Sequence, residues 1–111
     1  MAETFKSTPA IVTATVEGSA QTVYTVPGST TAVIIGMRVA NIDTSSPYNI
    51  NVFFTRSATN YYIGGKDTQI PLNSALEMQE GKLVLQTGDV LKVYADTTSK
   101  LHFTLSYIEI T

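Results

Sequence analysis

His102 is the only imidazole in the chain and is therefore the first residue to consider for catalysis. General-base catalysis needs a second group that orients the imidazole or receives its proton. The alternation of apolar and polar residues places His102 between Leu101 and Phe103, on the polar face of a strand. A histidine in that position is typically solvated or part of an interface, so we predict no catalytic residue.

Acidic residues are the remaining candidates for metal ligands, because one histidine and no cysteine cannot build a nitrogen or sulfur site. Asp43, Asp67, Asp89 and Asp96 each fall in a separate predicted turn, where aspartate commonly caps the local backbone. The Asp-x-Asp-x-Asp spacing of a calcium loop does not occur. Only turns that converge in space could form an oxygen-ligand site, and we predict no metal and no cofactor.

Two further motifs associated with catalysis are incomplete. The glycines and lysine of Ile63–Asp67 lack the spacing of a phosphate-binding loop and are not followed by a helical pattern. No serine lies in a Gly-x-Ser-x-Gly elbow. The segment around Gly64 is predicted to be a turn, and the chain is predicted not to be an enzyme.

Tyrosines raise a different possibility, a surface on which a sugar ring could stack. Tyr61 and Tyr62 are adjacent, but neighbouring residues of a strand face opposite sides, so at most one of them could join such a surface. Tryptophan, which carbohydrate modules favour for stacking, is absent. Packing of these rings in the core is the favoured interpretation, and a carbohydrate-binding β-sandwich module is kept as an alternative function.

Length and charge limit the elements that could position any site. The chain has 111 residues, which is enough for one domain with an ordinary core. Only 14% of the residues are charged and the formal net charge is −2, so a phosphate-neutralising surface is not expected, and nucleic acid is not a predicted partner. No apolar run reaches the roughly 20 residues that cross a bilayer, so we predict no membrane association.

The pattern of residue types predicts a domain made of strands. About a third of the residues are Thr, Val or Ile, which pack well on a pleated sheet, and no helical stripe is present. We therefore expect an all-β fold of eight or nine short strands, an antiparallel β-sandwich of the jelly-roll type. Gly88 and Asp89 separate Leu83–Gln86 from Val90–Ala95 at hairpin spacing. The apolar stripes that predict the core are Ala10, Val12, Ala14 and Val16; Val33, Ile35, Met37 and Val39; Ile50, Val52 and Phe54; Leu83 and Leu85; Leu91, Val93 and Ala95; and Leu101, Phe103, Leu105 and Tyr107.

Two segments are apolar on both faces. Residues 32–42 carry Ala32 and Ile34 on the second face, interrupted by Arg38, and Ile108 and Ile110 lie on the same face as His102. A sheet with one solvated face should not carry these side chains outward. Either a loop of the same chain covers them or a partner subunit does.

The first nine residues are expected to be separate from the domain at 10–111. Residues 1–9 are polar except for Phe5, which stands beside Lys6, and Pro9 precedes the first alternating stripe. One interpretation is a frayed terminus. The other is an N-terminal arm that adds a strand to a neighbouring subunit and fills a pocket there with Phe5.

Four segments carry a resemblance to a known class of proteins. The strand–turn–strand at Thr22–Gly36, the segment Ile70–Leu72, the Leu-x-x-Gly-Asp-x-Leu pattern within Gly81–Val93, and the ending Leu105–Thr111 together resemble small virion structural proteins of tailed bacteriophages. The resemblance covers most of the chain after residue 20. It implies a structural particle protein without catalysis.

Size favours one member of that class, the head decoration or cement protein, which is small and has a single domain. The resemblance then implies a virion protein on the capsid surface, made in the host cytoplasm, that stabilises the shell. Its partners would be the major capsid protein or other virion proteins and itself, as a homo-oligomer with a trimer favoured. A neck, tail or head-fibre component is the alternative within the class. The residues expected at the interface are Phe5, Lys6, Arg38, Tyr61, Tyr62, Ile108 and Ile110.

Overall fold

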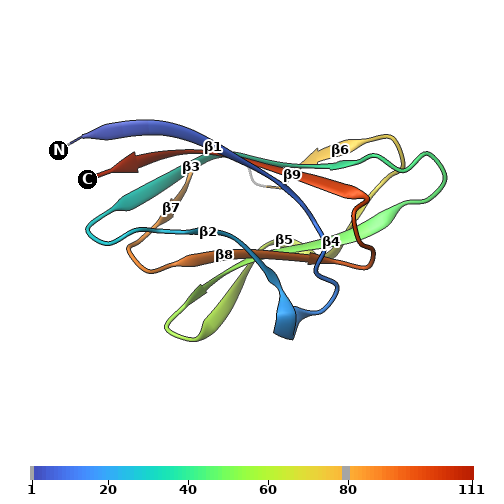
Figure 1. The fold of residues 1–111 in the computed structure, drawn as a ribbon, viewed down its shortest axis with the longest axis horizontal. Coiled ribbons are helices and arrows are strands. Elements are labelled where there is room, and N and C mark those ends of the chain that lie inside the picture. The colour runs from blue at the N-terminus through green and yellow to red at the C-terminus, as the bar shows by residue number, and fades with distance from the viewer. Residues whose placement is uncertain (1, 79–80) are drawn as a thin grey trace.

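The computed structural model describes residues 2–78 and 81–111, and these form a two-layered sandwich of nine strands. Figure 1 shows the two layers, with the two chain ends close together. One short 3₁₀ turn, Glu17–Ser19, is the only helical element of the described residues. The strands are β1 Glu3–Ile11, β2 Gln21–Thr25, β3 Thr31–Asn41, β4 Tyr48–Arg56, β5 Thr59–Ile70, β6 Ala75–Glu77, β7 Leu83–Leu85, β8 Val90–Ala95 and β9 Leu101–Ile110.

Strand order confirms the predicted all-β sandwich and its jelly-roll type. The first sheet, called sheet A below, has the order β1-β9-β3-β6, and β7 also pairs with β3; sheet B has the order β2-β8-β4-β5. When β6 and β7 are taken as one interrupted strand, the first strand pairs with the last and the second strand with the second-last. The next pair is β3 with β6 and β7, and the innermost pair is the β4–β5 hairpin. This nested antiparallel pairing is that of a jelly roll.

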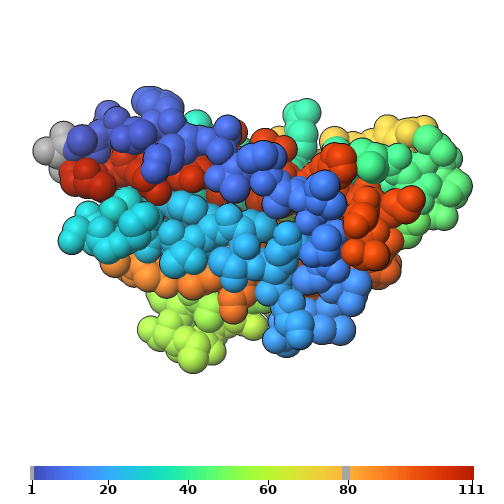
Figure 2. Space-filling model, viewed as in Figure 1, coloured from blue at the N-terminus to red at the C-terminus, as the bar shows by residue number. Residues whose placement is uncertain are grey.

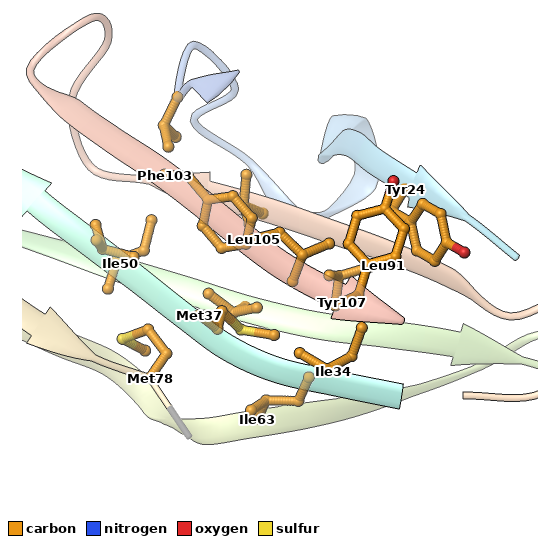
Figure 3. Packing of buried hydrophobic residues seen from close by; sticks show 14 of the residues in the cluster. Tyr24, Ile34, Met37, Ile50, Ile63, Met78, Leu91, Phe103, Leu105 and Tyr107 are labelled. Atoms are coloured by element: carbon orange, nitrogen blue, oxygen red, sulfur yellow. The ribbon is translucent and has the colours of Figure 1, made fainter. Parts of the chain in front are cut away.

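The core lies between the inward faces of the two sheets, as Figure 3 shows from close by. Strands β4, β8 and β9 turn the predicted stripes inward, because their residues follow the period of the pleat through those stripes, and only Phe54 at the end of the β4 stripe is partly buried. The largest fully buried side chains include Phe103, Leu105, Leu91, Ile50 and Met37. Removal of these side chains from water is the main stabilising contribution to the fold.

Strand β3 departs from the predicted stripe at one position. Its register against β9 shifts between Ile34 and Gly36, which marks a β-bulge at Ile35. The bulge reverses the inward parity, so that Ile34 before it and Met37 after it both enter the core. The prediction of one continuous inward face through Val33 and Ile35 is therefore wrong, and Val33 and Ile35 lie on the other face.

The expected hairpin at Gly88 and Asp89 is also wrong. Strand β7 pairs with β3 in sheet A, whereas β8 pairs with β2 and β4 in sheet B. The turn between them is hydrogen-bonded to the turn that connects β2 and β3: the Val26 amide donates to the Asp89 carbonyl (3.0 Å) and the Gly88 amide to the Val26 carbonyl (3.1 Å). The two turns thus satisfy each other's backbone hydrogen-bonding groups at the point where the chain crosses from one sheet to the other.

The N-terminal segment is part of the sandwich. Strand β1 starts at Glu3 and pairs antiparallel with β9 from Glu3↔Ile110 to Ile11↔His102, so the predicted boundary at Pro9 is wrong. Proline is tolerated because β1 is an edge strand, where one row of backbone groups has no partner strand. The predicted stripe also extends too far, because β1 ends at Ile11 and Val16 is exposed. Met1 lies outside the described residues.

Candidate functional site: the outer face of sheet A

Four apolar side chains form one row across sheet A on the side away from the core. The register pairs Phe5 of β1 with Ile108 of β9, Ile108 with Val33 of β3, and Val33 with Val84 of β7. Directly opposite residues share one face of an antiparallel sheet, so these four side chains are neighbours. We call this set the apolar row.

The apolar row is open to solvent. Phe5 is 72% exposed and Val84 is 52% exposed, while Ile108 and Val33 between them are partly buried. Ile35 at the bulge is 42% exposed, and Ile110 lies on the same face one pair away from Ile108. The described part of the chain thus leaves this end of the face uncovered. Ala32 and Ile34, which were expected on the same second face, lie instead in the core of the sandwich and are fully buried.

A shallow hollow lies at the other end of the same face. It has a volume of about 450 Å³ and a predominantly apolar lining. Pro9 and Ile11 of β1 and His102 and Thr104 of β9 pair across it, together with Ala10 and Phe103 between them. His102 is exposed, as alternation predicts.

Small side chains separate the apolar row from the hollow. The register places Ser7 of β1 opposite Ser106 of β9, and Ser106 opposite Gly36 of β3. A side chain at Gly36 would lie 3.6 Å from Glu77 Oε1 and 3.7 Å from Ser106 Cβ, so there is space there only for van der Waals contact. The middle of the face is therefore low, and the ring of Phe5 stands on one side of it.

Arg38 and Glu77 provide the charge of this face beside the hollow. They are directly paired between β3 and β6, with Arg38 Nε 3.5 Å from Glu77 Oε2. The other oxygen of Glu77 accepts a hydrogen bond from the Met37 amide (2.9 Å), which holds the carboxylate in place. The two charges offset each other within one chain.

Lys6 points to the opposite side of β1 from Phe5. Its Nζ lies 2.7 Å from Glu109 Oε1, and the hydroxyl of Tyr24 donates to Glu109 Oε2 (2.6 Å). The hydrogen bonds from Lys6 and Tyr24 lower the pKa of the Glu109 carboxyl, which is only 8% exposed. Burial and the hydrogen bond to Glu109 raise the pKa of Tyr24. Lys6 therefore connects β1 to the inside of the sandwich.

Tyr62 lies on the outer side of sheet B, opposite to the side of Tyr61, as alternation predicts. Its ring packs against the buried Phe53 with centroids 5.1 Å apart, and its hydroxyl donates to Glu17 Oε2 (2.6 Å). The hydroxyls of Tyr62 and Tyr94 are 3.0 Å apart. Burial and the bond to Glu17 raise the pKa of Tyr62, so this residue contributes to a structural cluster.

Tyr61 is 48% exposed and stacks on Phe54 with ring centroids 5.4 Å apart. The Arg56 guanidinium lies over Phe54 at 5.3 Å and donates from Nε to Asp89 Oδ1 (2.9 Å). Phe54, Arg56 and Tyr61 belong to the β4–β5 hairpin, which projects from the body of the molecule in Figure 2. They form an aromatic surface separate from the apolar row.

The four aspartates that were predicted to lie in turns bind protein groups. Asp67 and the segment around Gly64 lie within β5, so the turn predicted there is wrong. Asp43 accepts hydrogen bonds from the Tyr48 hydroxyl (2.6 Å) and from Ser45, and these lower its pKa to about 2. Asp67 accepts from the side chain of Asn51, Asp89 is bound by Arg56, and Asp96 accepts from the Asn49 amide. Among residues 2–78 and 81–111, no three acidic or histidine side chains are grouped to hold a metal ion.

The structure thus divides the seven residues expected at an interface. Phe5, Arg38, Ile108 and Ile110 share the outer face of sheet A, whereas Lys6, Tyr61 and Tyr62 lie elsewhere. Sequence reasoning missed Val33 and Val84. The alternation of side chains around both residues can be seen in the sequence. The bulge at Ile35 and the strand that pairs with β7 cannot.

Comparison of this chain with models of protein families, with curated proteins and with solved structures found no match. No helix within the described residues is long and apolar enough to cross a membrane.

Proposed function

We propose that this chain is a non-enzymatic structural protein of a tailed-phage virion, and that it decorates the capsid. It binds the outer surface of the head, with the major capsid protein and further copies of itself as partners, and it stabilises the shell. The observation that carries this proposal is the apolar row Phe5, Ile108, Val33 and Val84, which lies open on four neighbouring strands.

Two arguments support the proposal. Contiguous exposed apolar side chains mark surfaces that bind other proteins, because their removal from water is favourable. The jelly roll is an architecture that viral capsid proteins use, and also lectins, so the fold agrees with the proposal by analogy. The resemblance of the Thr22–Gly36 and Gly81–Val93 segments to small virion proteins favours a role in the virion over that of a lectin, and the small size of the chain favours decoration.

Sedimentation with phage heads tests the proposal. Heads of a phage that encodes this chain, prepared without the protein, are mixed with the purified chain and centrifuged. We expect saturable binding to the heads and a higher temperature of head disruption. A chain that stays in the supernatant at saturating concentration contradicts decoration, and a chain that sediments with isolated tails or necks indicates the alternative virion position.

Variants of the apolar row connect this binding to the surface. Phe5→Ser combined with Val84→Thr removes exposed apolar area and retains strand-compatible residues, so we expect at least tenfold weaker binding to heads. Tyr61→Ser is the matched control, because Tyr61 is also an exposed aromatic residue but lies on sheet B. Equal loss of binding in both variants would contradict a role for this face.

A carbohydrate-binding module remains the second candidate. The exposed Tyr61 ring, stacked on Phe54 beside Arg56, is the observation that favours it. Stacking of a sugar on an aromatic ring with a neighbouring donor is a common mode of carbohydrate recognition. Binding of the chain to a glycan array that Tyr61→Ser abolishes and the Phe5 and Val84 double variant retains would support this candidate.

A further inference from the structure

We propose that the outer face of sheet A binds the same face of a second copy, with Phe5 of each copy placed in the hollow of the other. The inference rests on the assembly role proposed above and names a second copy as the partner of that surface. The apolar-row variants would then weaken head binding because they remove the avidity of the pair. Face-to-face packing of two sheets is common and needs an apolar, uncovered face on each. The apolar row and the hollow provide such a face on one molecule.

The positions of the ring and the hollow define the symmetry. Phe5 lies on β1 before Ser7, and the hollow lies on β1 after it, at Pro9 and Ile11. A two-fold axis that lies between the faces and runs across the strands reverses the strand direction and keeps the lateral position. It therefore places Phe5 of one copy over Pro9 and Ile11 of the other, and the reverse contact forms at the same time.

The axis then passes over the small side chains of Ser7, Ser106 and Gly36. Small residues at this line allow the two faces to approach, and Gly36 has no side chain to separate them. Arg38 and Glu77 would be covered as a pair that is already neutralised within each copy. Covering this pair therefore leaves neither of these two charges unpaired, which would be costly. Glu3, opposite Ile110 in the register, is a further charged residue of this face.

The area of the face predicts the strength of the contact. Nine residues of β1 and four strands span about 27 Å by 19 Å at the usual rise and strand spacing, roughly 500 Å² for each copy. Two copies together bury about 1,000 Å², which is near the lower limit for a specific interface. We therefore expect a pair that dissociates on dilution.

This geometry differs from the trimer that the resemblance implied. In a closed ring of three, each contact joins two different patches. Here the phenyl ring of Phe5 and the hollow that receives it lie on the same face of the same two strands, β1 and β9. The contact between Phe5 and the hollow is therefore made twice between two copies.

Crosslinking at the axis tests the proposal directly. The chain has no cysteine, so one introduced thiol is unique. Ser7→Cys would lie close to the same residue of the second copy, and a short bis-maleimide should link it to a dimer in high yield. Thr59→Cys is the matched control, because Thr59 is exposed at the end of sheet B and should give little dimer. Equal yields from the two variants, or a trimer, would overturn the proposal.

Sedimentation equilibrium of the full chain gives the second measurement. We expect a monomer–dimer equilibrium that Phe5→Ser weakens at least tenfold and Phe5→Leu retains within a few-fold. Because Phe5 is exposed, both variants should keep the melting temperature of the parent chain to within a few degrees. If the chain stays monomeric at all concentrations and still binds phage heads, the proposed dimer is wrong and the proposed function stands. If the chain dimerises but fails to bind heads, the proposed function is wrong and the dimer stands.

Discussion

Glu109 illustrates how single residues tie the edge strand to the sandwich. Its carboxylate is nearly buried near the end of β9, and its oxygens are bound by Lys6 from β1 and Tyr24 from β2. The rings of Tyr24 and Tyr107 pack beside it with centroids 4.4 Å apart. Because a buried carboxylate without partners is costly, these contacts favour the arrangement in which β1 pairs with β9 in sheet A and β2 packs against them from sheet B.

Acid should weaken this cluster. The folded pKa of Glu109 is below its unfolded value, so its contribution is complete above the unfolded pKa of about 4.3 and is lost as pH falls through the folded pKa. Glu109→Gln should lower the free energy of unfolding by about 1–2 kcal/mol at pH 7. Urea unfolding at a series of pH values should show this difference shrinking below about pH 4. A difference that stays constant down to pH 2 would contradict the assignment.

His102 should contribute little to stability on its own. The structure places it exposed on β9, at the hollow, opposite Ile11 of β1. Removal of an exposed side chain without structural partners changes stability by about 0.5 kcal/mol or less. His102→Ala is therefore expected to unfold at nearly the same urea midpoint as the parent chain, and Phe103→Ala, at a fully buried position, serves as the destabilised comparison. A loss of several kcal/mol at His102 would show a missed interaction.

At the scale of elements, β1 and β3 decide what the outer face presents. Strand β1 places Phe5 beside Ile108, and the bulge in β3 turns Val33 and Ile35 outward while Ile34 and Met37 stay in the core. A one-residue change in register moves every following side chain to the other face of a sheet. The bulge is therefore the device that allows an apolar strand to supply both the core and the outer face.

Deletion of residues 2–8 tests the role of β1. The deletion removes most of the pairing with β9 and the partner of Glu109, so we expect a clear fall in the melting temperature of several degrees or more. Differential scanning calorimetry measures this. Lys6→Ala in the full chain is the control, because it removes the ion pair but keeps the strand. A truncated chain as stable as the full one would show that β1 behaves as a free arm.

At the scale of the whole molecule, the jelly roll joins distant parts of the chain. Strand β1 pairs with β9, β2 pairs with β8, and only β4 and β5 form a hairpin of neighbouring strands in sheet B. Long loops must close before such pairs form. The chain therefore loses conformational entropy before the contacts between the paired strands can offset that loss. The same topology brings the two chain ends together, with the Ala2 amide bound to the Thr111 carbonyl (3.0 Å).

Folding should consequently be slow for a chain of this length. We expect refolding in milliseconds to seconds, the range of all-β domains dominated by non-local pairs. Stopped-flow dilution from urea, followed by tyrosine fluorescence, measures the rate. Refolding in microseconds would contradict the non-local topology.

The sequence by itself determined the class of fold and the inward stripes of β4, β8 and β9, because alternation along a strand is a local property of the pleat. It also placed Tyr61 and Tyr62 on opposite faces and His102 outside. Tertiary structure alone decided that β7 and β8 lie in different sheets, that residues 3–9 belong to the sandwich, and that Phe5, Ile108, Val33 and Val84 meet in one row. The reason is that a row across four strands depends on pairing partners and register, which are set by contacts between residues far apart in the chain.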